Sequence, residues 1–420
     1  MHVNKIVSFS VVILLIAVLF AGAVTVPAAA AQSTAITLKP STTTLTVGQS
    51  VTFTATLKSG TISLAKKSVT IYHYLNGVRY ADTTKTTNAN GRITLAQRFG
   101  SPGIRTYYAS FTGDRAYAKS MSSVTRINVT TSRPSWGAVN DFTYVLQDIS
   151  LTAIGATKFD AVIIDYSRDG SDAGRFTKAQ INAHKYSSGG PKRVLAYMSV
   201  GEAEDYRWYW NPSWDANHDG KPDPGAPSWL GPQNPDWPGN YKVKYWDPGW
   251  QKIVHQYLAK IIATGYDGAY LDVIDAYLYW GPGGESGFNR ATAEAEMVSF
   301  VKSLAQDARV THGIAGFAIV PQNGEELSVH PDYVAVVTGI GEEDVWYNGN
   351  TRQPWADTAA VLRHLDVFKH AGKVVFVIDY VNKSSLIDDF YAKAQARGYV
   401  PYATVRDLDV LTINPGHKPN

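Results

Sequence analysis

The sequence predicts a multidomain protein, in which an all-β immunoglobulin-like sandwich is followed by an α/β (β/α)8 barrel. Three observations carry this prediction. The chain has 420 residues, which is long for one ordinary domain. Residues 33–130 are rich in Thr and Ser and contain short alternating apolar runs. Residues 136–415 alternate buried-strand patterns with amphipathic helical patterns instead, which is typical of a parallel sheet covered by helices.

Residues 1–31 have the pattern of a secretory signal. Lys5 precedes an apolar run over residues 6–26, and an Ala-rich stretch ends at Ala31. A basic start, an apolar middle and small residues before a cleavage point define such a signal. An uncleaved anchor is the alternative, since about 20 apolar residues can span a bilayer. Either way, we expect the rest of the chain to be extracellular or on the cell surface.

The overall composition excludes several classes of function. The formal net charge is +3, and no cluster of Lys and Arg marks a nucleic-acid surface. The absence of cysteine excludes a disulfide framework and thiolate metal sites. We expect a monomer that binds a polysaccharide substrate. It would contact a membrane only if the leader stays uncleaved.

The region 33–130 carries about seven short strand patterns, a number that fits an immunoglobulin-like sandwich. Asn76-Gly77 between two such patterns predicts a tight hairpin. The region resembles the bacterial and archaeal Ig-like modules of exported surface proteins. It holds no catalytic constellation, so we interpret it as a spacer or adhesion module. Residues 131–135, which include Pro134, form the predicted linker.

Eight apolar runs predict the strands of the barrel, and five amphipathic stretches predict helices between them. The runs cover residues 142–146, 159–164, 194–200, 269–272, 316–320, 333–337, 374–378 and 400–403. The helical stretches cover residues 177–186, 249–264, 291–310, 355–370 and 384–397. A doubly wound open sheet is the alternative, but the sequence lacks the Gly-rich phosphate-binding motifs that often accompany it.

Polar and acidic residues follow nearly every predicted strand. They are Asp165, Tyr166, Arg168, Glu202, Asp205, Asp272, Asp275, Gln322, Asn323, Glu342, Glu343, Asp379 and Tyr380. Because the carboxyl ends of barrel strands share one face, these side chains predict an acidic pocket there. Such a pocket suits glycoside hydrolysis, which needs one protonated and one ionised carboxyl group. Metal binding by oxygen ligands is the alternative.

Five segments in order resemble glycoside hydrolase family 114, over about residues 136–405. They are residues 162–170, 197–207, 265–275, 322–327 and 339–347. The resemblance implies a TIM-barrel endo-α-1,4-polygalactosaminidase, which needs no organic cofactor. It implies a catalytic Asp at Asp272 and a catalytic Glu at Glu343, although Glu342 is adjacent. Asp272 would be the nucleophile or base and Glu343 the acid, or the converse. The separation of the two carboxyl groups would then decide between retention and inversion.

The remaining strand-end residues are predicted substrate contacts, each with a structural alternative. Asp165 could instead pair with Arg168, and Asp275 could cap a helix. Gln322 and Asn323 could bind sugar hydroxyls or cap a helix at Glu325. The aromatic segment 206–247 predicts an ordered wall that stacks on sugars.

Within that segment, four side chains copy the start of a calcium-binding loop. They are Asp215, Asn217, Asp219 and Asp223, with Gly220 at the turn position. The usual Glu at the twelfth position is replaced by Ala226. We therefore expect either a structural calcium site or a polar turn. Two rival functions stay open for the whole protein, namely a non-catalytic carbohydrate-binding or adhesion protein and an oxygen-ligand metal hydrolase.

Overall fold

The computed structural model describes residues 30–46, 49–75, 77–99, 102–130, 132–281 and 287–419. Contacts divide the chain into two units, Met1–Val129 and Thr130–Asn420, which are described separately. The leader predicted at residues 1–31 lies almost wholly outside the described ranges, as does Asn76 of the predicted hairpin. Within those ranges, no helix combines the length and the apolar character needed to cross a membrane.

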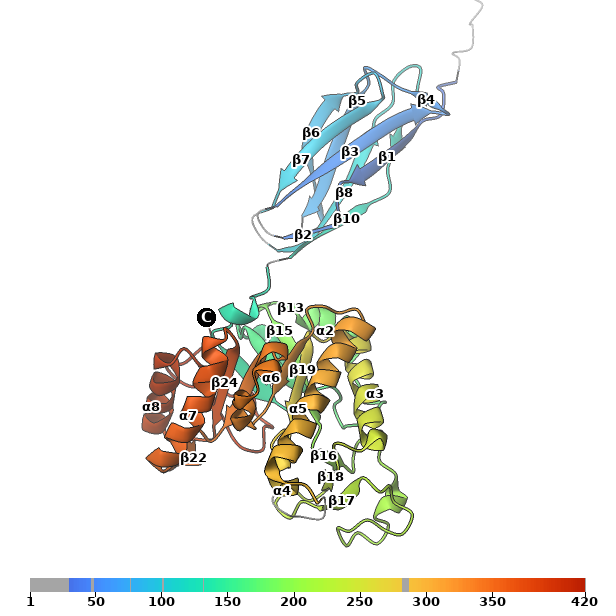
Figure 1. Ribbon diagram of the computed structural model, residues 1–420. Coiled ribbons are helices and arrows are strands. Elements are labelled where there is room, and N and C mark those ends of the chain that lie inside the picture. Colours follow the sequence, from blue (N-terminus) through green and yellow to red (C-terminus); the bar gives the residue numbers. More distant parts are fainter. Residues whose placement is uncertain are drawn as a thin grey trace, which may run out of the picture. The chain divides into compact units, whose positions relative to one another are not determined.

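The first unit is a sandwich of two β-sheets, coloured blue to cyan in Figure 1. One sheet contains β1 (Ala35–Pro40), β3 (Ser50–Ser59), β4 (Ile62–Ser63) and β7 (Arg92–Arg98). The other contains β2 (Thr44–Thr46), β10 (Thr125–Thr130), β8 (Gly103–Phe111), β5 (Ser68–Leu75), β6 (Val78–Thr86) and β9 (Ser120–Met121). Alternate residues of β3 are buried, including Val51, Phe53 and Leu57. This alternation places one face of each sheet in a shared core, as an Ig-like sandwich requires.

The second unit contains eight principal strands that follow one another in sequence order. They are β11 (Phe142–Val145), β12 (Ala161–Asp165), β15 (Arg193–Ser199), β19 (Gly268–Asp272), β20 (Ala318–Pro321), β21 (Gly339–Glu343), β24 (Val374–Asp379) and β25 (Val400–Ala403). Parallel ladders join the first five and the last three, and a single parallel bridge between Gln322 and Gly341 links the two groups. No ladder in the described ranges joins β25 to β11. At that edge, Thr143 Oγ1 donates a 2.9 Å hydrogen bond to the hydroxyl of Tyr402.

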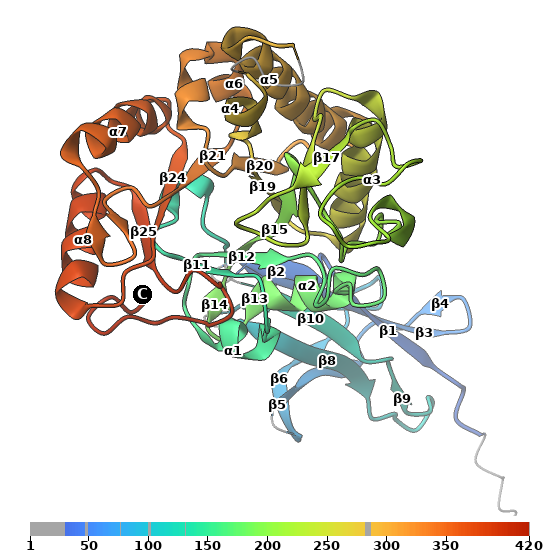
Figure 2. The ribbon, with the colours of Figure 1, turned by 90° about the horizontal axis from the view of Figure 1, so that it is seen from below.

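Helices cover the outside of these strands (Figure 2). They are α1 (Leu151–Ala156), α2 (Lys178–His184), α3 (Pro248–Thr264), α4 (Ala276–Trp280), α5 (Arg290–Gln306), α6 (Pro331–Val336), α7 (Trp355–His370) and α8 (Ser384–Ala396). Helix α3 begins after Asp247, whose side chain accepts from the Gly249 N–H, and ends at Gly265 with φ +89°. Its buried face, which includes Val254 and Leu258, packs into the main core and leads the chain into β19.

The strand predicted at residues 333–337 is wrong. Those residues lie mostly in helix α6, which starts at Pro331, and the sixth strand is β21. A short apolar run buried in a core has no period that separates helix from strand, and Pro at the first helical position favours the helix. As a result, Glu342 and Glu343 are the last residues of the strand itself. Because strand residues alternate, their side chains point to opposite faces.

The segment 206–247 contains secondary structure that the sequence did not suggest. A small antiparallel sheet joins β16 (Glu202–Glu204), β18 (Asn240–Val243) and β17 (Leu230–Gln233). Most of its tryptophans pack into the core, and Trp229 is buried. Trp237 is 50% exposed. The predicted aromatic wall is therefore wrong for most of these rings, which stabilise the segment instead.

Short elements complete the unit. They are the strands β13 (Tyr186–Ser187), β14 (Gly190–Pro191), β22 (Tyr347–Asn348) and β23 (Thr351–Arg352), the 3-10 turns Trp136–Ala138, Pro212–Trp214 and Glu325–Val329, and the π-helical turn Asp307–Thr311.

Candidate active site

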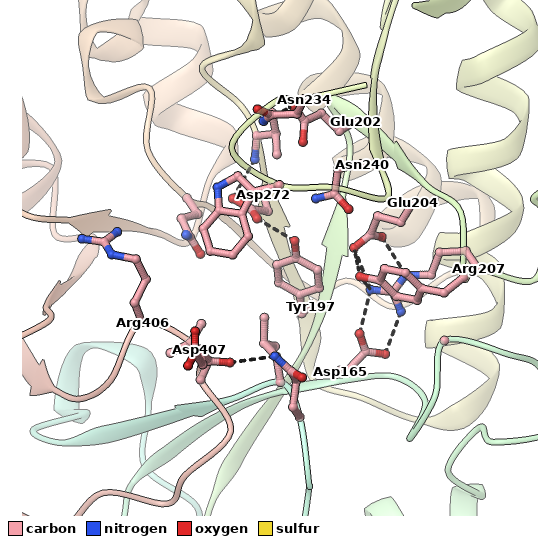
Figure 3. A pocket seen from close by; sticks show the side chains of 18 of the residues that line it. Asp165, Tyr197, Glu202, Glu204, Arg207, Asn234, Asn240, Asp272, Arg406 and Asp407 are labelled. Atoms are coloured by element: carbon pink, nitrogen blue, oxygen red, sulfur yellow. Dashed lines mark hydrogen bonds and ion pairs between the residues drawn. The ribbon is translucent and has the colours of Figure 1, made fainter. Parts of the chain in front are cut away.

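A cavity of about 720 Å³ opens at the carboxyl ends of the parallel strands. Ten of its residues are labelled in Figure 3, and they come from β12, β15, β16, β18, β19, the loops beside them and the segment after β25. Among the described residues, nine Asp or Glu line the cavity, against four Lys or Arg. The predicted acidic pocket at the strand ends is therefore present in the structure.

Asp272 ends β19 and lines this cavity. Its Oδ2 accepts a 2.6 Å hydrogen bond from the Tyr197 hydroxyl, and its Oδ1 accepts from the Val273 N–H at 2.8 Å. Val273 has φ +58°, a rare conformation for a β-branched residue. Strain of this kind persists where surrounding structure holds it, often at functional sites. Burial, reinforced by the charge of Glu343, raises the pKa of Asp272 to about 8.

Glu343 ends β21 and lines the same cavity. Its carboxylate accepts from Gln322 Nε2 at 2.5 Å, from Asn323 Nδ2 at 3.3 Å and from the Tyr380 hydroxyl. The Tyr144 hydroxyl donates to Gln322 Oε1 at 2.8 Å and so fixes the amide that serves Glu343. Burial raises the pKa of Glu343 above its ordinary value, while its three donors oppose that shift. Two buried carboxyl groups that repel each other's ionisation tend to share one proton.

A buried cluster around Arg207 forms one wall of the cavity (Figure 3). Arg207 Nη2 lies 2.7 Å from Asp165 Oδ2, and its Nε lies 2.6 Å from Glu204 Oε2. Tyr206 also donates to Glu204 at 2.5 Å. Side-chain exposure is 0% for Arg207 and 1% for Glu204, so both charges depend on each other for solvation. Sequence reasoning did not select Arg207, Glu204 or Tyr197. Alternation along β16 could have found Glu204, because it shares a face with Glu202.

Other predicted residues also line the cavity. Glu202 accepts from Lys242 at 2.5 Å and from Asn234 at 2.9 Å. Asp275 precedes α4 but makes no capping hydrogen bond, and Asn323 caps no helix either. Burial raises the pKa of Asp275.

Of four further predicted substrate contacts, three lie outside the cavity lining. Arg168 lines the cavity but does not pair with Asp165, since it donates to the Gly174 carbonyl and lies over the Phe176 ring. Tyr166 is fully buried and donates to Asp172. Asp379 is fully buried and accepts from the N–H groups of residues 345–347, so it holds the chain after β21. Asp205 is exposed and lies outside the cavity lining.

The four predicted calcium ligands all accept hydrogen bonds from nearby backbone N–H groups. Asp215 accepts from Asp219 and Gly220, and Asp223 accepts from Ala216. Asn217 and Asp219 accept from residues 219 and 221, respectively. No group of three or more His, Cys, Asp or Glu residues within the described ranges is arranged to hold a metal ion. The calcium site stays a prediction.

Glycosidases typically use a pair of carboxyl groups, and two carboxyl groups line this cavity at the ends of parallel strands. The chain matches Glycoside-hydrolase family GH114 over residues 124–418, and it belongs to that family. Residues 36–130 match the bacterial Ig-like domain (group 3). Both resemblances seen in the sequence are thereby confirmed.

The chain is also similar to other proteins and to solved structures. An uncharacterized protein of Methanocaldococcus jannaschii is 36% identical over 281 residues, covering 64% of this chain and 77% of the relative. One from Deinococcus radiodurans is 37% identical over 265 residues, covering 63% and 79%. The glycoside hydrolase domain of PelA from Pseudomonas aeruginosa is 19% identical with a TM-score of 0.48, covering 65% of this chain and 98% of that one. Ega3 of Aspergillus fumigatus, solved with galactosamine, is 19% identical with a TM-score of 0.48, covering 67% and 96%.

Proposed function

We propose that this protein hydrolyses internal glycosidic bonds of an amino-sugar polysaccharide of the galactosamine type, with Asp272 and Glu343 as its catalytic pair. The observation that carries the proposal is that these two carboxyl groups end β19 and β21 and line one cavity. Each is held by hydrogen-bond donors that fix its position. Fixed geometry of this kind supplies much of the advantage of an enzyme over solution.

In the proposed reaction, the bond between the anomeric carbon and the bridging oxygen breaks. Glu343 gives its proton to the leaving oxygen, and Asp272 either attacks the anomeric carbon or activates the attacking water. Water finally supplies a hydroxyl group to the anomeric carbon and a proton to the carboxyl pair. In the unliganded protein, the raised pKa of Asp272 favours the proton on that residue. These roles therefore require the proton to lie on Glu343 in the substrate complex, and a cationic sugar beside Asp272 would favour that transfer.

The charge of the cavity supports an amino-sugar substrate. Three of its four basic residues are committed to carboxylates, since Arg207, Lys242 and Arg406 each form an ion pair. Asp272, Asp275 and Glu343 form no ion pair with Lys or Arg among the described residues. A cavity with this excess of carboxylates attracts cations, and the ammonium groups of unacetylated amino sugars are cations.

Several broader features belong to the same proposal. The Thr143–Tyr402 contact supports a barrel that closes between β11 and β25. The leader pattern and the Ig-like domain support an extracellular or cell-surface location for a monomeric enzyme. We propose no organic cofactor, and any calcium bound at Asp215 would be structural.

The proposal is tested by incubating the purified chain with a panel of galactosamine-containing polymers and analysing products by mass spectrometry. We expect internal cleavage that persists in EDTA and falls by at least about 100-fold in Asp272→Asn and Glu343→Gln. A matched Asp236→Asn variant, which changes an exposed residue outside the cavity lining, should keep full activity. Binding without product release would instead identify a carbohydrate-binding protein. Loss of cleavage in EDTA would favour a metal hydrolase.

A further inference from the structure

A second cavity, of about 400 Å³, adjoins the first. Asp275, Asn323 and Glu343 line both cavities. The second is otherwise formed by the start of α4, the first residue of α5, the turn at Glu325–Val329 and the end of β21. Glu342 lines only the second cavity, because successive residues of β21 face opposite ways. The adjacent residues Glu342 and Glu343 of β21 therefore differ in the cavities that they line: Glu342 lines the second alone and Glu343 lines both.

Two buried polar groups of this cavity have no hydrogen-bond partner in the described part of the chain. They are Glu342 Oε2, in a residue that is 6% exposed, and the hydroxyl of Tyr277, in a residue that is 0% exposed. Both residues line the cavity. Leaving a buried polar group unpaired costs about 1–3 kcal/mol, and more for a charged group. Polar atoms left in this state at the wall of a cavity are available to bind a polar ligand.

The charge of the cavity defines what kind of ligand fits. Among the described residues, Arg290 is its only basic lining residue, and it forms ion pairs with Glu294 and Glu326. Asp344 is paired with Arg406. Asp275, Glu325 and Glu342 form no ion pair with Lys or Arg among the described residues, although the charge of Lys242 acts on Asp275. Burial, with added repulsion from Glu325 and Asp275, raises the pKa of Glu342 well above its usual range. A bound cation would relieve that repulsion.

A single metal ion does not fit, since no three acidic or imidazole side chains within the described ranges converge on one point. A cationic sugar can use acceptors that do not converge on one point, because its ammonium and hydroxyl groups place donors at separate positions. The volume also falls within the range of small-molecule pockets, roughly 300–1,000 Å³. We propose that this cavity is a subsite for the protonated amino group of a hexosamine unit beside the cleaved bond, read by Glu342, Glu325 and Asp275. This inference rests on the proposed hydrolysis of an amino-sugar polymer.

The subsite should bind free amino sugars in preference to N-acetylated ones, because N-acetylation removes the positive charge that the three carboxyl groups would bind. The full chain should therefore be assayed on two oligosaccharides of equal length, one of galactosamine and one of N-acetylgalactosamine. Glu342→Gln and Glu325→Gln keep side-chain shape and remove the charge. Glu296→Gln is the matched control, since Glu296 lies on α5 and lines neither cavity.

For the free-amine substrate, we expect each of the two variants to raise KM by about tenfold with little change in kcat. Their kcat/KM for the acetylated substrate should equal that of the wild type, as should every value for Glu296→Gln. Equal effects on both substrates, or unchanged KM, would overturn the subsite while leaving the hydrolase proposal intact. Because Glu325 is only partly buried, its variant keeps the test valid if Glu342→Gln does not fold.

Calorimetry distinguishes failure of the hydrolase proposal from failure of the subsite proposal. If the wild type cleaves neither substrate, the binding of galactosamine and of N-acetylgalactosamine still tests the subsite directly. Preferential binding of galactosamine that is lost in Glu342→Gln would support the subsite without hydrolysis. Equal binding of the two sugars, or no binding of either, would overturn it.

Discussion

The hydroxyl of Tyr197 donates to Oδ2 of Asp272 over 2.6 Å, between neighbouring parallel strands. Strand register explains this contact, because Tyr197 pairs with Tyr270, which shares a face with Asp272. The hydrogen bond favours the ionised form of Asp272 and opposes the rise in its pKa that burial causes. Tyr197 is therefore a positioning residue that also regulates the protonation of the proposed nucleophile or base.

Replacing Tyr197 with Phe should raise the pKa of Asp272 further, because the ring stays and only the donor is lost. A hydrogen bond to a charged group contributes about 1.5–3 kcal/mol, so kcat near pH 7 should fall by about 10- to 100-fold. The pH profile of kcat should move to higher pH, a change that general loss of stability would not cause. Tyr399→Phe is the control, since its hydroxyl contacts Asp366 outside the cavity lining. An unmoved pH profile would contradict this role for Tyr197.

The proposed roles of the carboxyl pair predict different responses to an activated substrate. An aryl glycoside with an acidic leaving group needs little protonation, so Glu343→Gln should keep much of its activity on that substrate. Asp272→Asn should lose activity on both activated and ordinary substrates, because the attacking step itself is lost. Steady-state kinetics of the two variants on both substrates measure this difference. The reverse pattern would exchange the roles of Asp272 and Glu343.

The strand ends of the second unit could be predicted because each apolar run stops at a polar residue. Asp272 and Gln322 were predicted in this way, whereas Glu343 was predicted from the family resemblance, since the predicted sixth strand ended at residue 337. All three residues line the cavity. The pattern could not separate a buried helix from a buried strand at residues 333–337, since both are short and apolar. The pattern also could not show whether an acidic residue at a strand end faces the cavity or the core. Asp379 shows this limit, because its carboxylate binds three backbone N–H groups in the core.

The sequence did not reveal side-chain contacts between residues that are far apart along the chain. The structural alternative for Asp165 was a pair with Arg168, three residues away, but its partner is Arg207. Arg207 reaches it from the segment after β16, whose path depends on a small sheet with no strong sequence pattern. Tyr197 was not selected because it lies within an apolar run, two residues before the end of its strand. Its role depends on the neighbouring strand, which only the register shows.

Replacing Arg207 with Met should strongly destabilise the second unit. The change would leave Asp165 and Glu204 buried without their cation, and breaking a buried ion pair in this way costs about 3–5 kcal/mol. All 11 tryptophans lie at residue 136 or later, so denaturant unfolding followed by Trp fluorescence reports on this unit alone. Arg397→Met is the control, because its pair with Asp366 is about one-third exposed and should contribute no more than about 1 kcal/mol. Equal losses in the two variants would contradict the importance of burial.

The raised pKa values of Asp272 and Asp379 predict that the second unit loses stability as pH rises. Burial raises these values to about 8 and about 7, whereas both groups would titrate near 4 in an unfolded chain. Between about pH 4 and pH 8, the folded state therefore binds more protons than the unfolded state. Because stability falls with pH wherever the folded state binds more protons, this contribution is complete below pH 4 and is lost as pH passes 8.

Asp272→Asn isolates the share of this effect that belongs to the active site. The amide does not ionise, so the variant should gain Tm relative to the wild type progressively from pH 4 to pH 8, measured by Trp fluorescence. The exposed control Asp236→Asn should show a Tm difference that does not change with pH. The decline that remains in Asp272→Asn would belong partly to Asp379, whose pKa lies about one unit lower and whose effect should therefore end near pH 7. A constant difference between Asp272→Asn and the wild type would mean that Asp272 titrates near its ordinary value, and that the carboxyl pair holds no shared proton at neutral pH.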